Sequence, residues 1–354
     1  MSLMRFRRAC RCLHLRQLCT SASTSDDTHL LLSAFNEDTF HQHFFSIPII
    51  HDSLSLGSPT PLFTLPSHPM GLTSSRYLNP LFCFHGPNDH DPILTYNPTT
   101  QQTLTLPFDP PIPAATATTW DIKTHFGFDP ITKLHKILRV KWIEPIPQSI
   151  PRVINMECMV LTLGKGSWRK INTVLPFNCT KFGNGGESLC INGAIHWLTC
   201  YGDSIVAFDL KDENFRLIPL PHGYKEETYA PIRLKYERLI EVGGRLALLG
   251  DTVYKGESIM HMWILKDYHN HVWVKKRILY PVSWINCGQP VPIGTISTGE
   301  ILLKPLSLYK TKRLAWLLFY DMDGRGFKKV DITGLPEWIS SGGPRIIRTI
   351  AVYG

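Results

Sequence analysis

The residues best suited to metal chemistry are histidines and cysteines in close pairs. His41-x-His43 and His269-x-His271 each place two imidazoles on one face of an extended segment, and Cys10-x-Cys12-x-His14 forms a third group. A tetrahedral zinc site needs three or four ligands, and cysteine ligands are usually spaced more widely than in this group. Because neither histidine pair has a third ligand that the sequence can place, we predict no metal site and no cofactor.

Carboxylate and glycine motifs also stop short of a reactive site. Residues 321–326 (DMDGRG) begin like a calcium loop, but Arg325 replaces an acidic ligand and Ile332 stands where the bidentate glutamate belongs, so we predict a hairpin turn. The glycine-rich segments 164–167 and 183–186 lack the frame of a phosphate loop, and no serine lies in a G-x-S-x-G motif. We therefore predict no catalytic residues and a protein that is not an enzyme.

The elements that carry these residues are predicted to be strands. Hydrophobic residues make up 43% of the 354 residues and charged residues 19%, which is typical of a folded chain. The 27 Pro and 25 Gly interrupt the chain too often for long helices, and the 11% of aromatic residues favour half-buried strands. The nine Cys form no regular framework, so we expect reduced, mostly buried thiols. Composition therefore favours an all-β fold.

A unit of four short strands recurs along the chain. The clearest copy starts at Leu189, where Asn192-Gly193 forms the strongest short hairpin signal because both residues accept a positive φ. A second copy carries a Gly243-Gly244 turn. Unit starts are predicted at five positions separated by 45 to 63 residues, namely Leu81, Phe126, Leu189, Arg238 and Ile293.

A period near 50 residues with four strands per repeat is typical of a kelch-like β-propeller blade. Strand-like segments also precede the first unit, at 29–35 and 44–50, and one follows the last, at 346–353. If the last segment joins the first two, they form a further blade and leave fewer exposed edges. We therefore predict an all-β propeller of about six blades, and we assign the longest spacing to an insertion at Ile143–Arg152.

Most tryptophans are predicted to fill the core between blades. Trp168, Trp197, Trp263, Trp273 and Trp316 all lie in predicted strands. Three others lie in less regular segments and are the candidates for partner-binding surface aromatics: Trp120, Trp284 and Trp338.

The formal net charge of +8 is concentrated at the two ends of the chain. Residues 1–25 hold five Arg and no acidic residue, and residues 301–354 are also basic, whereas residues 26–300 nearly cancel. Without a long basic stripe we do not expect nucleic-acid binding. The apolar runs are far shorter than the roughly 20 residues of a membrane helix, so we expect no membrane association either.

Several segments, in order, resemble plant F-box proteins that carry an F-box-associated propeller. They are Phe126–Pro130, Trp168–Ile171, Cys190–Leu198, Phe208–Phe215 and Met262–Leu265, within a match that covers roughly residues 70–335. The resemblance implies a protein-interaction subunit without catalysis of its own. Its F-box would bind the Skp-type adaptor of a cullin (SCF-type) ubiquitin ligase, and its propeller would capture a target protein. It also implies a cytoplasmic or nuclear location.

The first 25 residues resemble only the closing helix of an F-box. Leu3, Phe6, Cys10 and Leu13 fall on one helical stripe and are the candidate adaptor-binding residues, but the opening half of an F-box has no counterpart. We therefore divide the chain into a partial F-box-like helix or basic leader, 1–25, and a propeller, 26–354. Adaptor binding is in doubt, and a detached propeller that no longer binds the adaptor is one alternative.

Two further alternatives stay open. The Arg-rich, acid-free residues 1–25 end in a hydroxyl-rich run, 20–25, which is the composition of a transit peptide for a mitochondrion or plastid. A propeller enzyme would instead need Asp, Glu or His on its innermost strands, where the assignable strands are mostly apolar.

Overall fold

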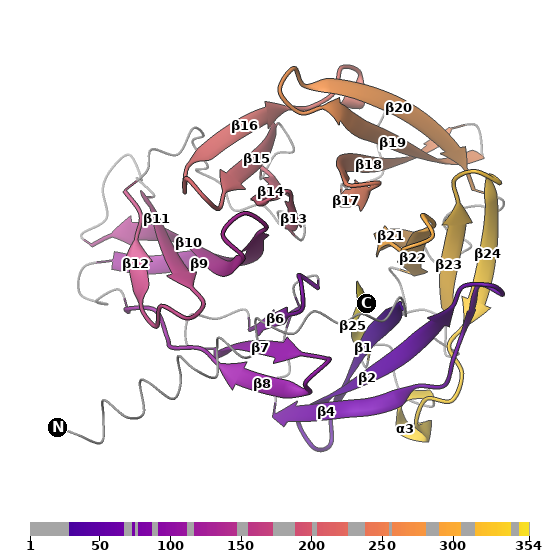
Figure 1. Cartoon of the computed structure of the whole chain (residues 1–354), viewed down its shortest axis with the longest axis horizontal. Coiled ribbons are helices and arrows are strands. Elements are labelled where there is room, and N and C mark those ends of the chain that lie inside the picture. Colours follow the sequence, from indigo (N-terminus) through magenta and orange to yellow (C-terminus); the bar gives the residue numbers. More distant parts are fainter. Residues whose placement is uncertain are drawn as a thin grey trace. The chain divides into compact units, whose positions relative to one another are not determined.

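The structure is a computed structural model that is built almost entirely of antiparallel strands (Figure 1). It describes residues 28–66, 73–74, 77–86, 91–111, 117–146, 155–172, 188–199, 204–225, 238–254, 257–280, 290–305, 316–340 and 347–353. The partial F-box-like segment 1–25 lies outside these residues, and so do its candidate residues Leu3, Phe6, Cys10 and Leu13. Among the helices that the structure describes, none is long and apolar enough to cross a membrane.

The described residues divide into two compact units, the first within Thr73–Pro219 and the second within residues 28–66 and 220–353. The first unit holds three four-stranded sheets, ordered β5-β6-β7-β8, β12-β11-β10-β9 and β13-β14-β15-β16. Their strands are β5 (Thr73–Ser74), β6 (Phe82–His85), β7 (Ile93–Asn97), β8 (Gln102–Thr105), β9 (Ala117–Asp129), β10 (Leu134–Pro145), β11 (Asn155–Thr162), β12 (Trp168–Lys170), β13 (Leu189–Ile191), β14 (Ala194–Leu198), β15 (Ser204–Asp209) and β16 (Phe215–Pro219).

The second unit holds two more four-stranded sheets, β17-β18-β19-β20 and β21-β22-β23-β24, and a sheet that joins both ends of the chain. In that last sheet the order is β25-β1-β2-β3, and β4 also pairs with β2. The elements are β1 (His29–Asn36), β2 (His41–Ile50), β3 (Ser55–Leu56), β4 (Thr60–Pro66), β17 (Arg238–Val242), β18 (Arg245–Tyr254), β19 (Glu257–Asp267), β20 (Val272–Leu279), β21 (Pro290–Thr295), β22 (Ile301–Pro305), β23 (Trp316–Asp321), β24 (Gly326–Asp331), α3 (Glu337–Ser340) and β25 (Ile347–Tyr353).

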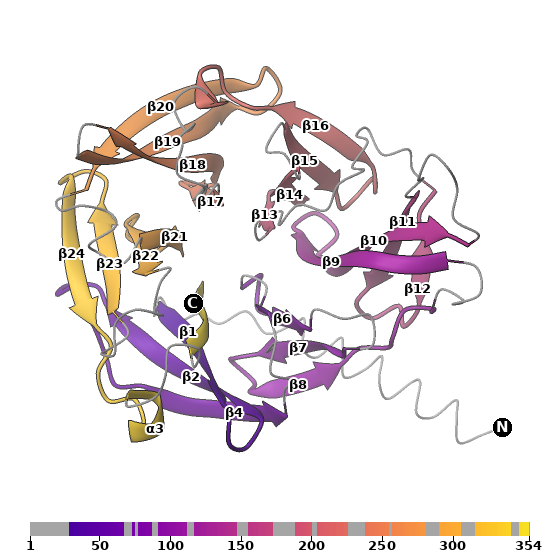
Figure 2. The ribbon, with the colours of Figure 1, turned by 180° about the vertical axis from the view of Figure 1, so that it is seen from behind.

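The six sheets confirm the predicted fold class, an all-β propeller with six blades (Figures 1 and 2). The predicted sixth blade is also confirmed, because β25 pairs antiparallel with β1 from His29↔Tyr353 onward. The Asn192-Gly193 turn has φ values of 49° and 78°, as the hairpin signal requires.

Several boundaries predicted from the sequence are wrong. The second strand repeat starts with β9 at Ala117 rather than at Phe126, because the residues of this strand before Phe126 are mostly polar. The first blade starts at β5 rather than at Leu81, because a two-residue strand carries too few residues to show any periodicity. The predicted insertion at Ile143–Arg152 is in part a strand, since Ile143, Glu144 and Pro145 still pair with β9.

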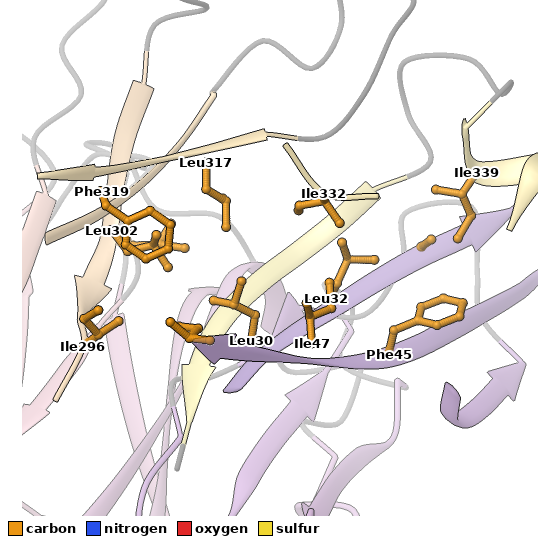
Figure 3. Packing of buried hydrophobic residues seen from close by; sticks show 13 residues of the cluster. Leu30, Leu32, Phe45, Ile47, Ile296, Leu302, Leu317, Phe319, Ile332 and Ile339 are labelled. Atoms are coloured by element: carbon orange, nitrogen blue, oxygen red, sulfur yellow. The ribbon is translucent and has the colours of Figure 1, made fainter. Parts of the chain in front are cut away.

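Neighbouring sheets within each unit pack face to face through apolar clusters. In the second unit, Leu30, Leu32 and Ile47 of the sheet that joins the chain ends lie close to Leu302, Leu317 and Phe319 of the β21–β24 sheet (Figure 3). In the first unit, Leu138, Val140 and Trp142 of β10 pack against Ile195, Trp197, Val206 and Phe208. Alternation along each strand therefore supplies both faces of a blade with core residues.

One hairpin with the same geometry occurs in all six sheets. Its first residue is an Asn or Asp whose side-chain oxygen accepts a hydrogen bond from the N–H two residues ahead, at 2.9–3.0 Å. The residue four positions after that Asn or Asp is not a glycine, yet its φ lies between 53° and 57°. The pairs are Asn36 and Phe40, Asn97 and Gln101, Asp129 and Lys133, Asp209 and Glu213, Asp267 and His271, and Asp321 and Arg325. The 321–326 segment is thus a hairpin turn, as predicted.

Glycine at the left-handed position of these hairpins is expected to stabilise the protein. Gln101→Gly and Lys133→Gly should each raise the free energy of unfolding by about 0.5–1 kcal/mol, because both side chains are exposed and non-glycine residues are strained at positive φ. Urea unfolding measures the change. The control Thr100→Gly lies one residue before Gln101 at ordinary φ and should lower stability; equal effects at Thr100 and Gln101 would contradict the strain argument.

Candidate functional site

The motifs that carry the family resemblance lie against one another in the first unit. Gly127 of β9 faces the third sheet so closely that an added Cβ would lie 2.7 Å from Leu210 Cδ1 and 2.8 Å from Ile195 Cγ1. The Cys190 thiol approaches the backbone of Phe128, accepting from its N–H at 3.4 Å. These motifs are therefore contacts between two blades rather than a ligand site.

An ion cluster extends this contact. Lys136 of β10 forms an ion pair with Glu213 at 2.7 Å, and its ammonium also donates to the Leu210 carbonyl. Arg169 of β12 contacts the same Glu213 carboxylate. Both cations hold the pKa of Glu213 below its usual value, although burial alone would raise it. Because Glu213 sits at the left-handed position of its hairpin, the turn itself aims the carboxylate at the neighbouring sheet.

A second, deeper cluster was missed by the sequence reasoning. Arg139 and Lys141, both on β10, contact the two carboxylate oxygens of Asp109, with Lys141 Nζ 2.6 Å from Asp109 Oδ2. The three side chains are only 2%, 0% and 1% exposed. The alternation of charged residues with Leu138 and Val140 was visible in the sequence, but it is equally typical of a half-solvated strand.

The buried thiols and imidazoles in the described residues are poorly suited to catalysis. Burial raises the pKa of the Cys158 thiol to about 12 and also raises that of Cys83, so neither is a thiolate near neutral pH. Burial lowers the pKa of His85, His135 and His196 to about 4 and that of His125 to about 3. These imidazoles are neutral and are held by backbone carbonyls or by stacking, as His125 is on Trp197 with ring centroids 4.4 Å apart.

The two histidine pairs gather no further metal ligand from the part of the chain that the structure describes. His43 of β2 lies 3.0 Å from Thr64 Oγ1 and against the Trp338 ring, and His41 contacts the Thr39 carbonyl. His269 and His271 lie in the β19–β20 hairpin. Within the described ranges, no group of three or more His, Cys, Asp or Glu could hold a metal ion. The described cysteines Cys83, Cys158 and Cys190 are reduced thiols outside any disulfide, as predicted.

Asp251 of β18 is a half-buried acid of the second unit. Tyr280 donates to its carboxylate at 3.3 Å, and burial raises the Asp251 pKa to about 7. When folding raises the pKa of an acid, its contribution to stability is greatest at pH values where the acid is protonated in both the folded and the unfolded protein. Its contribution is complete below about pH 4, the pKa in the unfolded chain, and is lost as the pH rises toward 7.

Asp251→Asn is therefore expected to raise the free energy of unfolding at pH 8 by roughly 1–3 kcal/mol, with little effect at pH 4. The amide keeps an oxygen that can accept from Tyr280. Urea unfolding at the two pH values measures the difference, with Asp331→Asn on the exposed end of β24 as the control. Equal stabilisation at both pH values would show that the carboxyl does not titrate in this range.

The candidate surface tryptophans have different outcomes. Trp338 of α3 is half-buried and packs against the apolar cluster that contains Leu30, Leu32 and Ile47. Its ring lies 5.0 Å from that of His43, measured between centroids. Trp120 lies in β9 and Trp284 lies outside the described residues. Of the predicted core tryptophans, Trp168, Trp197, Trp263 and Trp316 are buried as expected, whereas Trp273 is half-buried. Partner binding by the three candidates stays a prediction.

Exposed apolar side chains mark other possible contact surfaces that sequence reasoning did not identify. Phe40 and Ile131 lie in the turns of the hairpins that begin at Asn36 and Asp129. Val272, Val274 and Leu279 lie on the single strand β20. Only the order of the strands in the sheet shows that the β20 residues lie on an outer edge, so no pattern in the sequence marks them as surface residues.

Comparison with known proteins agrees with this architecture. A family model described as "F-box associated beta propeller domain" matches residues 29–350. An F-box/LRR-repeat protein of Arabidopsis thaliana is 26% identical over 255 residues, which is 68% of this chain and 56% of the relative. F-box protein DOR of Arabidopsis thaliana is 30% identical over 254 residues, again 68% and 56%. The chain matches little more than half the length of these relatives.

Proposed function

Because the chain belongs to the F-box-associated β-propeller family, we propose that it is the substrate-recognition subunit of an SCF-type ubiquitin ligase. The observation that supports this most directly is the family match, which spans all six sheets. In this role the propeller captures a target protein and an F-box binds the Skp-type adaptor, which links the target to the cullin. The subunit has no catalytic step of its own and works in the cytoplasm or nucleus.

The chemistry of the described residues fits a binding role. The charged clusters join blades. His85, His125, His135 and His196 are buried and neutral, and the Cys83 and Cys158 thiols are protonated. The described surface also exposes several large apolar side chains, among them Phe40 and Ile131 in hairpin turns and three residues of β20. Such side chains supply contact area for a protein partner.

The proposal separates adaptor binding from target binding, and one pull-down design tests both. The baits are this chain, the same chain with a complete F-box grafted ahead of Arg5, and the grafted F-box alone. Adaptor recovery with purified Skp-type protein and target recovery from plant extract are measured for each bait. Adaptor recovery by the ungrafted chain, relative to its graft, shows how much adaptor binding the segment with Leu3, Phe6, Cys10 and Leu13 provides without the rest of an F-box.

We expect the grafted chain to retain the adaptor and, with the cullin added, to promote ubiquitination of proteins that also bind the ungrafted chain. Those proteins should be missing from the bait that lacks the propeller. Failure of the grafted chain to retain the adaptor, or a set of ubiquitinated proteins that does not depend on the propeller, would reject the role.

A further inference from the structure

Strand β20 is an outer edge with an unusual set of exposed side chains. It is the last strand in the order β17-β18-β19-β20, and among the described strands it pairs with β19 alone (Figures 1 and 2). Val272, Val274 and Leu279 are 46%, 42% and 54% exposed. Alternate residues of an edge strand direct their N–H and C=O groups away from the sheet, so this eight-residue strand offers a template for one more strand.

The same strand carries three consecutive exposed cations, Lys275, Lys276 and Arg277. Lys275 lies over the Trp263 ring, 5.2 Å from its centroid, and Arg277 reaches Glu257 only at 4.0 Å. All of these groups are at the surface, where such contacts are weak. The edge is therefore both apolar and positively charged.

The corresponding strand of the next sheet shows that this is not a general property of outer strands. Strand β24 also carries two lysines, but Lys328 donates to the Ser53 carbonyl, and Lys329 is 3.5 Å from Asp331. Lys329 also lies over the Trp316 ring, 5.2 Å from its centroid, as Lys275 does over Trp263. Strand β24 differs from β20 because none of its described side chains is a large exposed apolar one. The lysines of β24 provide a matched comparison for the cations of β20.

The register of β20 defines what an added strand would meet. Lys275 and Arg277 lie opposite Trp263 and His261 of β19 and share one face of the sheet, while Val274 and Lys276 lie on the other face. An incoming strand with carboxylates at alternate positions would place them beside Lys275 and Arg277, and its intervening apolar residues beside Val274. Each such cross-strand pair contributes about 0.2–1 kcal/mol.

We propose that β20 is a docking edge for an acidic, extended segment of a partner protein, which adds to the β17–β20 sheet as a fifth strand. Charge complementarity selects this occupant, because a second copy of β20 would bring two sets of three cations together. Backbone hydrogen bonds supply affinity and the alternating carboxylates supply specificity. The proposal rests on the proposed function, since it states the chemistry of the segment that the propeller captures.

A direct binding experiment with short peptides tests the docking edge. The probes are a fluorescein-labelled peptide of alternating Glu and Val, ten residues long, and a Lys and Val peptide of the same length. The protein is the purified full chain, compared with Lys275→Glu/Arg277→Glu, the two cations that share the face of the proposed carboxylates. The matched control is Lys328→Glu/Lys329→Glu on β24. Fluorescence polarisation gives Kd at low and high salt.

Two N-methylated versions of the Glu and Val peptide then test strand addition itself. One carries methyl groups on one set of alternate amides, and the other on the remaining set. A peptide paired with one edge uses only one of the two sets for hydrogen bonds to β20. Blocking one set should therefore abolish binding, whereas blocking the other should leave it nearly unchanged.

We expect the Glu and Val peptide to bind, the Lys and Val peptide not to bind, and the β20 double variant to lose at least tenfold in affinity while the β24 variant stays within twofold. Raising the salt should weaken binding. Equal loss in the two variants, equal effects of the two N-methylated sets, or equally tight binding of an eight-nucleotide RNA would overturn the proposal. None of these measurements involves the adaptor, so failure here is distinct from failure of the ligase role.

Discussion

Replacing Asp109 with alanine is expected to lower the free energy of unfolding by about 3–5 kcal/mol. The substitution leaves Arg139 and Lys141 buried without the carboxylate that both contact. Removing one member of a buried ion cluster is costly because the remaining charges stay buried without the carboxylate that offset part of their desolvation. A loss of this size is a large fraction of the stability of an ordinary domain.

Urea unfolding followed by tryptophan fluorescence measures this loss, and an exposed ion pair in the same sheet supplies the control. Lys170 lies 2.7 Å from Glu157, with 58% of its side chain exposed. Lys170→Ala should change stability by less than about 1 kcal/mol, because exposed pairs contribute little. Similar losses for the two variants would show that Asp109 is solvated in the folded protein.

If the buried charges of the cluster give no net stabilisation, replacing all three charged side chains should destabilise the protein less than replacing Asp109 alone. The triple variant Asp109→Leu/Arg139→Met/Lys141→Met replaces the charges with apolar side chains of comparable size. It is expected to be more stable than Asp109→Ala, since an apolar replacement of a buried ion cluster is often neutral. A triple variant less stable than the single one would mean that the cluster has a net stabilising role.

Acidification to pH 5 is expected to unfold the first unit before the second. Its four buried histidines, His85, His125, His135 and His196, have pKa values of about 3 to 4, because burial disfavours the charged imidazolium. In the unfolded chain each would take up a proton near pH 6.5. Their contribution to stability is complete above that value and is lost as the pH falls from 6.5 toward 4.

The expected loss at pH 5 is on the order of several kcal/mol for the four groups together, which is comparable to the total stability of a domain. Asp251 of the second unit changes in the opposite direction, since its contribution grows as the pH falls. Hydrogen exchange followed by mass spectrometry at pH 7 and pH 5, corrected for intrinsic rates, should therefore show lost protection in β9, β10 and β14 before it appears in β18 and β19.

A variant at His125 distinguishes this effect from general acid denaturation. His125→Phe keeps a ring that can stack on Trp197 but cannot take up a proton. It should move the acid midpoint of the first unit to lower pH, whereas His269→Gln in the exposed β19–β20 turn should leave the midpoint unchanged. Equal midpoints for the wild type and His125→Phe would remove His125 from the explanation.

The sequence predicted the local features of the fold well because they are recorded in neighbouring residues. The Asn192-Gly193 turn, the strand alternation of Leu138, Val140 and Trp142, and the terminal strand at 346–353 were all readable from residue type and spacing. The two-residue strand β5 was missed because it is too short to carry a pattern, and the continuation of β10 to Pro145 was missed because proline-rich segments resemble loops.

The sequence by itself determined the strand repeat and the family, since both depend on the order of short motifs along the chain. Only the tertiary structure decided what those motifs do: Phe126–Pro130 and Cys190–Leu198 form a contact between blades, with Gly127 against Ile195. The burial of Arg139 and Lys141 against Asp109, and the position of β20 at an outer edge, were likewise decided there. Burial and strand order depend on pairings between distant residues, and a one-dimensional pattern does not contain them.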